Sequence, residues 1–273
     1  MNFMASLEGL GGFPMIGKVE SYLLKKIREE GAIHITLIDP DKVTGEFASI
    51  ISSESESLGS SAIMIGGSTI AKQIVFEDIT KAIKKSVDIP VILFPNNVTS
   101  INRYADAIWF MSLLNSSDPY FIIGAHVLAA PLIKEIGLEA IPLGYIIIGE
   151  GGAASVIGKA CPIPYNKPEL AVAHALAAQF LGMRFIYLEA GSGARRSIPP
   201  EMVREVKKAI DATLIVGGGI KTGKQAKQIV SAGADIVVTG TVIERSKRGE
   251  IKNKLVEIIE GVKEGAKIKL RGG

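Results

Sequence analysis

Three glycine-rich segments in the last third of the chain have the composition of a phosphate-binding site. They are Gly191-Ser192-Gly193, Gly217-Gly218-Gly219 and Gly240-Thr241, and each closely follows a short apolar run. Glycine lets backbone N–H groups approach an anion closely, so such loops bind phosphate without cationic side chains. Ser192 adds a hydroxyl donor that suits a phosphate oxygen. The alternative, that these glycines only make tight turns, stays open at this point.

A tyrosine and a glutamate precede the first of these segments. Tyr187 and Glu189 are two residues apart, so on a strand both side chains project from the same face. A carboxylate beside a phosphate site suits hydrogen bonding to a substrate hydroxyl, or removal of its proton. Two structural alternatives remain: Glu189 could form an ion pair with Arg195 or Arg196, and Tyr187 could be a packing residue.

Carboxylates also follow an apolar run near the start of the chain. Asp39 is placed for a hard cation such as Mg²⁺, which takes one or two carboxylates and leaves other positions to water and phosphate. Ser68 could supply a further oxygen, whereas we expect Asp41 to be a turn or helix-capping carboxylate. No His/Cys spacing suggests zinc, because the three histidines are isolated: His34, His126 and His174.

These residues need a scaffold, and eight short apolar runs separated by helix-like stretches predict one. The runs are Ile33–Ile38, Ala62–Ile65, Pro90–Phe94, Ala107–Met111, Ala140–Ile148, Phe185–Leu188, Thr213–Val216 and Asp235–Val238. Runs without polar alternation are typical of a sheet covered on both faces, and their alternation with helices predicts parallel βαβ units. Eight such units favour an α/β fold, a closed (β/α)8 TIM barrel, over an open doubly wound sheet.

The 273 residues are expected to form one domain, since a barrel of this kind typically takes about 250 residues and no linker divides the chain. Apolar residues at helical spacing between Val19 and Ile27 predict an extra N-terminal helix, and residues 1–17 are expected to be a flexible or capping segment. A further helix is predicted to start at Gly45. Other clear helical patterns cover residues 70–85, 168–181, 199–210 and 222–231, and a last one runs to about residue 262.

Composition excludes several classes of protein. The net charge is only +3, and the basic residues near the C-terminus, which have no aromatic residues between them, are expected to be a solvated helix end and not a nucleic-acid surface. The single cysteine, Cys161, excludes an intramolecular disulfide. No stretch is apolar enough to span a bilayer, and residues 1–17 lack the basic start of a signal peptide. We therefore expect a soluble cytoplasmic protein.

The motifs taken together resemble the geranylgeranylglyceryl phosphate synthase family, with its bacterial heptaprenylglyceryl phosphate synthase relatives, over nearly the whole chain. The run Tyr187–Gly193 (Tyr-Leu-Glu-Ala-Gly-Ser-Gly) is the most specific. The others are Ile35–Lys42, Gly66-Gly67-Ser68, Trp109–Ser116, Val216–Ile220 and Gly240-Thr241.

This resemblance implies a Mg²⁺-dependent prenyltransferase that joins the C3 hydroxyl of sn-glycerol 1-phosphate to a prenyl diphosphate, in archaeal ether-lipid (phospholipid) biosynthesis. It implies metal ligands at Asp39 and Ser68, and Glu189 and Tyr187 as catalytic residues. The implied glycerol phosphate site is Tyr187, Leu188, Glu189, Ala190, Gly191, Ser192, Gly193, Gly218, Gly219, Gly240 and Thr241. An ordinary Glu, with a pKa of about 4.3, is a weak base, so positioning of the substrates should supply most of the rate gain.

The resemblance also implies a homo-oligomer, a dimer or a hexamer, for which Ile122 and Ile123 are candidate interface residues, and transient contact with a membrane surface. The prenyl chain needs an apolar groove, for which the candidates are Phe94, Trp109, Phe110, Tyr120, Phe121 and Tyr145. The chain length stays open between geranylgeranyl and another donor such as heptaprenyl. Two rivals remain: another phosphate-binding barrel, an isomerase or aldolase, and a non-catalytic binder of phosphorylated metabolites.

Overall fold

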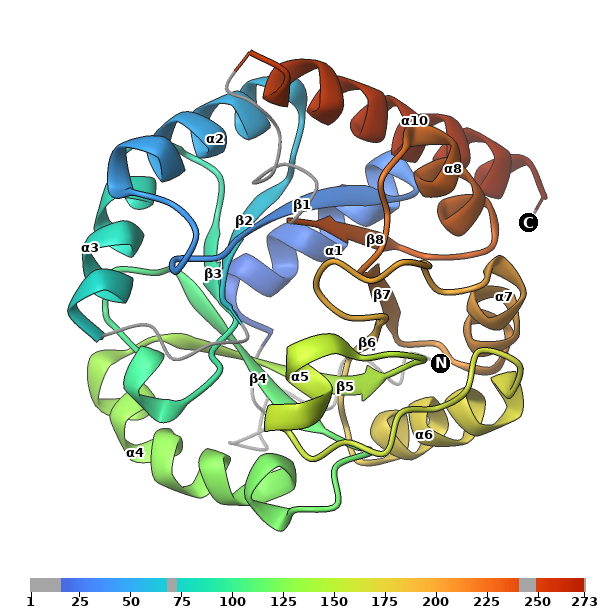
Figure 1. Ribbon diagram of the computed structural model, residues 1–273, viewed down its shortest axis with the longest axis horizontal. Coiled ribbons are helices and arrows are strands. Elements are labelled where there is room, and N and C mark those ends of the chain that lie inside the picture. The colour runs from blue at the N-terminus through green and yellow to red at the C-terminus, as the bar shows by residue number, and fades with distance from the viewer. Residues whose placement is uncertain (1–15, 68–72, 241–248, 273) are drawn as a thin grey trace, which may run out of the picture.

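The eight strands form a closed parallel barrel in chain order, in which β1 pairs with both β2 and β8 (Figure 1). The computed structural model describes residues 16–67, 73–240 and 249–272. The strands are β1 (Ile33–Ile38), β2 (Ala62–Ile65), β3 (Val91–Leu93), β4 (Ala107–Leu113), β5 (Glu139–Ile147), β6 (Phe185–Glu189), β7 (Thr213–Gly217) and β8 (Ile236–Thr239). The predicted (β/α)8 barrel is therefore confirmed, and the open sheet is excluded.

Helices cover the outside of the barrel, as expected from strands that are apolar on both faces. The longer ones are α1 (Lys18–Glu30), α2 (Gly45–Leu58), α3 (Gln73–Lys84), α4 (Ala125–Ile136), α6 (Pro168–Phe180), α7 (Pro200–Ala209), α8 (Gly223–Ser231) and α10 (Ile251–Gly272). Three short ones are η2 (Val98–Ser100), the π-helical turn η3 (Tyr120–Gly124) and α5 (Gly152–Ile157). Within these described ranges, no helix is both long and apolar enough to cross a membrane.

Alternate strand residues fill the barrel interior with large side chains. On β6, Phe185 and Tyr187 point inward while Leu188 points outward to the helices, which follows from the two-residue period of a strand. Trp109 of β4 and Phe185 contact each other at 5.1 Å between ring centroids in this interior, and both are almost fully buried. The interior is thus a packed core, and an active site can form only at the C-terminal ends of the strands.

The predicted N-terminal helix α1 lies across one mouth of the barrel (Figure 1). Its buried Val19 and Leu23 join the interior cluster. Its first turn is held by a carboxylate from far along the chain, because the backbone N–H groups of Val19 and Glu20 both donate to Glu139 at 2.9 Å. The expected capping segment at residues 1–17 lies almost wholly outside the described residues.

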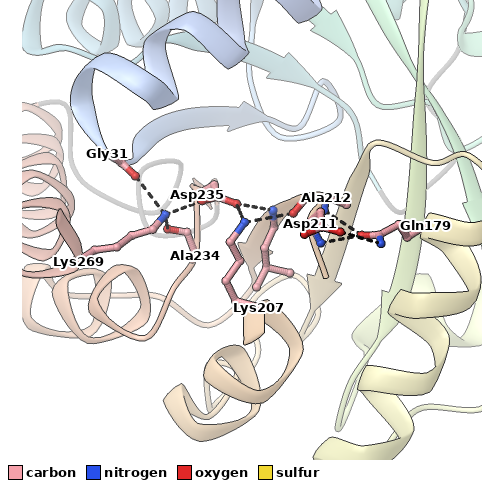
Figure 2. Close-up of polar contacts among 9 residues, drawn as sticks. Gly31, Gln179, Lys207, Asp211, Ala212, Ala234, Asp235 and Lys269 are labelled. Atoms are coloured by element: carbon pink, nitrogen blue, oxygen red, sulfur yellow. Dashed lines mark hydrogen bonds and ion pairs between the residues drawn. The ribbon is translucent and has the colours of Figure 1, made fainter. Parts of the chain in front are cut away.

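The C-terminal helix corrects two predictions. It runs to Gly272, well past the predicted end near residue 262. Lys269 is not a solvated side chain, because its ammonium group contacts Asp235 Oδ1 at 2.5 Å and donates to the carbonyl of Gly31 at 3.1 Å (Figure 2). Lys207 holds the other oxygen of Asp235 at 2.7 Å. Because Asp235 directly precedes β8, this network ties α7, α10 and the start of β1 to the last strand.

Other differences concern the ends of elements and one short helix. Most strands and helices shift by one or two residues, as is usual for element ends. The described part of α3 begins at Gln73, and the predicted start at residue 70 lies outside the described residues. The helix α5 was missed, because six residues with glycine on both sides carry no clear helical period.

Candidate active site

A cavity of about 720 Å³ opens at the C-terminal ends of the strands. The first residues beyond several strands border it, including Asp39 after β1, Phe94 after β3 and Gly240 after β8, as does Glu189 at the end of β6. Strand ends from opposite parts of the sequence meet here because the barrel is closed. This is the end of a (β/α)8 barrel where active sites form.

Glu189 is a buried carboxylate that borders this cavity. It ends β6, is 6% exposed, and accepts a hydrogen bond of 2.6 Å from the backbone N–H of Gly191. Burial raises the pKa of Glu189 above its ordinary value, although the Tyr187 hydroxyl and the Gly191 N–H partly offset this. The expectation of an ordinary carboxyl is therefore corrected: Glu189 is a stronger base than a solvated glutamate. Glu189, Arg195 and Arg196 all lie in the described part of the chain, and the polar groups that act on the Glu189 carboxyl there are Tyr187 and Gly191, not either arginine.

Tyr187 lies below Glu189 and is 1% exposed. Its hydroxyl has no well-formed hydrogen bond to any described residue, yet it is near enough to Glu189 for each group to shift the pKa of the other. The ring packs against Tyr145 at 5.3 Å and Phe94 at 5.7 Å between centroids. The ring of Tyr187 therefore packs in the barrel interior, and its buried hydroxyl lies at the bottom of the cavity.

The glycines after β6 and β7 adopt backbone conformations that other residues avoid. Gly191, Gly218 and Gly219 have φ values of +106°, +79° and +69°. They also pack closely: a Cβ atom added at Gly218 would lie 2.4 Å from Glu189 Oε1 and 2.7 Å from the Gly191 nitrogen. The two glycine loops and the carboxylate therefore form one compact unit. Glycine-rich loops of this kind can bind an anion through backbone N–H groups.

The structure sorts ten of the eleven predicted glycerol phosphate residues into two groups. Those that border the cavity are Tyr187, Glu189, Ser192, Gly193, Gly218, Gly219 and Gly240. Leu188 and Ala190 do not, because their side chains point outward into the core between strands and helices, and Gly191 is buried beneath the loop. Thr241 lies outside the described residues.

The predicted metal ligand Asp39 borders the same cavity on the opposite side. It is 5% exposed, its Oδ2 atom pairs with Lys42 Nζ at 2.5 Å, and its Oδ1 atom accepts from the Asp41 N–H at 3.1 Å. A Cβ atom at Gly67 would lie 2.3 Å from Asp39 Oδ1, so a larger residue there would displace the carboxylate. Ser68, the second predicted ligand, directly follows but lies outside the described residues. The described residues include no cluster of three His, Cys, Asp or Glu side chains.

One oxygen donor nevertheless fits Mg²⁺, which often takes one or two carboxylates and completes its shell with water and phosphate oxygens. Asp39 supplies a buried hard ligand facing the cavity where a phosphate would lie. The donor chemistry is compatible with the predicted metal, which stays a prediction.

An apolar groove extends from the cavity between β4, η2 and α4. All six predicted groove residues border the cavity: Phe94, Trp109, Phe110, Tyr120, Phe121 and Tyr145. The far part is lined by residues that the sequence analysis missed, namely Ile101, Ile108, Ala129 and Ile133. Ala129 and Ile133 are four residues apart on α4, a spacing that places both on one face of a helix. The sequence did not reveal which face this was, because the outer residues of α4 are equally apolar.

The loop between β5 and α6 also borders the cavity, through Ala154, Ile157 and Gly158 of the missed helix α5 and its end. Asn115, at the end of β4, holds this loop by donating to the carbonyls of Ile147 and Cys161, both at 2.9 Å. The loop in turn contacts the first glycine segment and closes one side of the site.

A buried carboxylate of raised pKa, glycine-rich loops and an apolar groove meet in the mouth of a (β/α)8 barrel. This combination is typical of an enzyme that brings a phosphate ester to an apolar partner. A comparison with protein-family models matches residues 25–262 to the PcrB family. The chain belongs to the PcrB family.

Known relatives agree with this assignment and with the resemblance seen in the sequence. The geranylgeranylglyceryl phosphate synthase of Thermofilum pendens is 50% identical over 252 residues, which are 92% of this chain and 98% of that protein. The enzyme of the same name from Pyrococcus abyssi is 53% identical over 249 residues, 91% of this chain and 99% of its own.

Solved structures give the same picture. The (S)-3-O-geranylgeranylglyceryl phosphate synthase of Thermoplasma acidophilum, crystallised with sn-glycerol-1-phosphate, superposes with a TM-score of 0.87 at 39% identity, covering 92% of this chain and 100% of that one. A thiamine phosphate pyrophosphorylase from Pyrococcus furiosus superposes with a TM-score of 0.59 at 14% identity, which shows a shared fold alone.

Proposed function

We propose that this protein is a geranylgeranylglyceryl phosphate synthase, a prenyltransferase that forms the ether bond between sn-glycerol 1-phosphate and geranylgeranyl diphosphate. One observation carries the proposal: Glu189, the glycine-lined anion site and the apolar groove all open into the same cavity. A polar phosphate ester and a long hydrocarbon can therefore meet at one buried base. The names of the relatives favour a geranylgeranyl donor over the other chain lengths.

The glycerol phosphate would bind with its phosphate on the N–H groups of the glycine loops and its hydroxyls toward Glu189. The oxygen of its C3 hydroxyl attacks C1 of the prenyl group, the bond from C1 to the diphosphate oxygen breaks, and that electron pair leaves with the diphosphate. Glu189 accepts the hydroxyl proton, which its raised pKa favours. The anion site fixes one end of the nucleophile, so positioning adds to the effect of the base.

Asp39, with Ser68 beyond the described residues, would hold Mg²⁺ on the diphosphate side of the cavity. Bound Mg²⁺ would offset the charge that develops on the leaving diphosphate. On the apolar side of the cavity, the rings of Phe94 and Tyr145 pack edge to face at 5.3 Å between centroids.

A phosphate-handling isomerase or aldolase of the same fold is the weaker candidate. Such enzymes use a second acid–base residue or a lysine that forms a Schiff base. Three described lysines border the cavity: Lys42 and Lys221 from loops and Lys254 from α10. None of these three stands at an inward strand position. The apolar groove also has no purpose for a small polar substrate.

The remaining partners stay predictions. We expect transient contact with a membrane surface, where a prenyl diphosphate resides, and a homo-oligomer, a dimer or a hexamer. Ile123, one of the two suggested interface residues, is 57% exposed and Ile122 is 36% exposed, so both are available for such a contact. No nucleic-acid partner is expected, and cytoplasmic location stays a prediction.

The direct test is a transfer assay with radiolabelled sn-glycerol 1-phosphate, a panel of prenyl diphosphates, and either Mg²⁺ or EDTA. We expect organic-extractable product that depends on Mg²⁺ and is greatest with the geranylgeranyl donor. Asp39→Ala should abolish it, whereas Asp41→Ala, a matched carboxylate two residues away, should retain most of it. A folded wild-type protein that binds glycerol phosphate but makes no product with any donor would reject the proposed function.

A further inference from the structure

Four polar side chains lie buried together on the outer face of the barrel strands, between the strands and the surrounding helices. They are His34 and Thr36 on β1, Ser60 just before β2, and Thr239 at the end of β8, and none is more than 4% exposed. Because residues 33 and 35 fill the barrel interior, residues 34 and 36 face outward, toward the surrounding helices. The cluster is therefore outside the cavity already described, although it reaches the cavity's edge.

The imidazole of His34 connects the two ends of this cluster. Its Nδ1 atom lies 2.7 Å from Ser60 Oγ, and its Nε2 atom lies 2.8 Å from Thr239 Oγ1. Thr36 Oγ1 lies 3.1 Å from the same Ser60 oxygen. Burial lowers the pKa of His34 to about 3, so the ring is neutral at ordinary pH and has one donor and one acceptor. Each nitrogen then has one partner, and the ring is fully satisfied.

Stability alone does not account for this network. Elsewhere on the outer face of these strands the side chains are apolar, such as Ile38 on β1 and Val237 on β8. A satisfied buried polar network is often no more stable than apolar packing, but it rigidifies its members and selects one arrangement.

The member that leads to the active site is Thr239. It is the last residue of β8, it borders the cavity, and it directly precedes Gly240, one of the predicted phosphate-binding glycines. Thr239 of β8 stands directly opposite Thr36 of β1, where the first and last strands pair to close the barrel. His34, two residues before Thr36, therefore contacts Thr239 diagonally on the same face of the sheet. Gly240 packs tightly there, since a Cβ atom would lie 2.9 Å from the carbonyl oxygen of Leu37.

We propose that His34 is a positioning residue of the phosphate site: its bond to the Thr239 hydroxyl holds the end of β8 so that the backbone N–H group of Gly240 faces the phosphate. The inference rests on the proposed function, because it takes a phosphate to be the group bound there. His34 touches no substrate itself. It acts across the seam between the first and last strands, which lie 205 residues apart in the chain.

The test is the dissociation constant of sn-glycerol 1-phosphate, measured by calorimetry without a prenyl donor, for variants that keep one of the two His34 contacts. A glutamine amide can take the place of Nε2, and an asparagine amide the place of Nδ1. We expect His34→Asn and Thr239→Val to raise Kd about five- to tenfold, the effect of misplacing one or two hydrogen bonds. His34→Gln and Thr239→Ser, which keep the contact, should stay within about threefold of wild type.

Two further readouts separate positioning from general damage to the fold. The KM for the prenyl diphosphate, and kcat at saturating glycerol phosphate, should change less than twofold, about 0.4 kcal/mol. The double variant His34→Asn/Thr239→Val should bind no more weakly than either single variant, because both remove the same contact. Melting curves of all variants identify any that fail to fold.

The inference is overturned if folded His34→Asn and Thr239→Val bind glycerol phosphate like wild type, or if the two substitutions add in the double variant. Inorganic phosphate serves as a second probe that does not depend on the substrate. If wild type binds inorganic phosphate but not glycerol phosphate, the proposed function fails. The inference about His34 is then still supported if His34→Asn and Thr239→Val bind inorganic phosphate more weakly than His34→Gln and Thr239→Ser. Failure to bind either probe overturns both.

Discussion

Replacing Gly218 with alanine should damage glycerol phosphate binding far more than it damages the fold. Gly218 has a φ of +79°, and an added Cβ atom would lie 2.4 Å from Glu189 Oε1, 2.7 Å from the Gly191 nitrogen and 2.9 Å from the Ala190 nitrogen. Ordinary contacts of a Cβ atom begin near 3.4 Å. The methyl group therefore forces apart the carboxylate and the first glycine loop.

The size of the effect has two parts. The left-handed backbone costs a non-glycine residue roughly 1–2 kcal/mol, which lowers the free energy of unfolding. The second part falls on the site, where the Glu189 carboxylate must move by about 1 Å. A displacement of that size costs a catalytic site on the order of 100-fold in rate. We expect kcat/KM for glycerol phosphate to fall by about two orders of magnitude, with the larger share in KM.

A matched control separates the two parts. Gly182, in the turn between α6 and β6, has a similar φ of +88° and nothing within 4 Å of an added Cβ atom. Gly182→Ala should lose similar stability in denaturant unfolding and keep wild-type kinetics. Steady-state transfer assays at varied glycerol phosphate measure both variants. If Gly218→Ala has the same KM and kcat as Gly182→Ala, the close packing of the glycine loop against Glu189 is not functional, and the reasoning is refuted.

Three other perturbations test separate features of the molecule. Burial raises the pKa of Glu189, and the carboxylate must be ionised to accept a proton, so activity should fall with decreasing pH along a limb centred above the ordinary pKa of a glutamate. Glu189→Gln should remove this limb from the pH profile of kcat/KM and lower kcat by at least about 100-fold. An acid limb that is unchanged in the variant would assign it to another group. Ala129→Phe should fill the far part of the groove, so the assay with a donor panel should show a shift toward shorter prenyl chains, and an unchanged preference would place the chain elsewhere. Lys269→Met should lower the free energy of unfolding by about 1–3 kcal/mol, because it leaves a buried oxygen of Asp235 without its partner. As a control, Lys267→Met, at an exposed lysine of the same helix, should change the free energy of unfolding by less than about 0.5 kcal/mol. Equal effects of the two substitutions in denaturant unfolding would contradict the network in Figure 2.

The element pattern and the polar strand ends could be predicted from the sequence. Buried parallel strands are apolar on both faces, so runs such as Ile33–Ile38 and Thr213–Val216 stand out from the helices between them. Tyr187 and Glu189 share a face by the two-residue period of a strand, and the glycines after β6 and β7 mark turns that other residues resist. These signals are local, so they survive without a structure.

The rest depended on contacts between distant parts of the chain. Burial of Glu189, and with it the raised pKa, comes from packing around the barrel mouth and cannot be read from neighbouring residues. Lys269 looked solvated until the fold brought it to Asp235, and His34 looked merely isolated until barrel closure brought it to Thr239. The sequence by itself determined which residue types stand at the strand ends, because backbone period and glycine conformation are local properties. Only the tertiary structure decided which of them meet and how strongly they are buried, because desolvation and hydrogen bonding depend on neighbours that the chain brings together by closing the barrel.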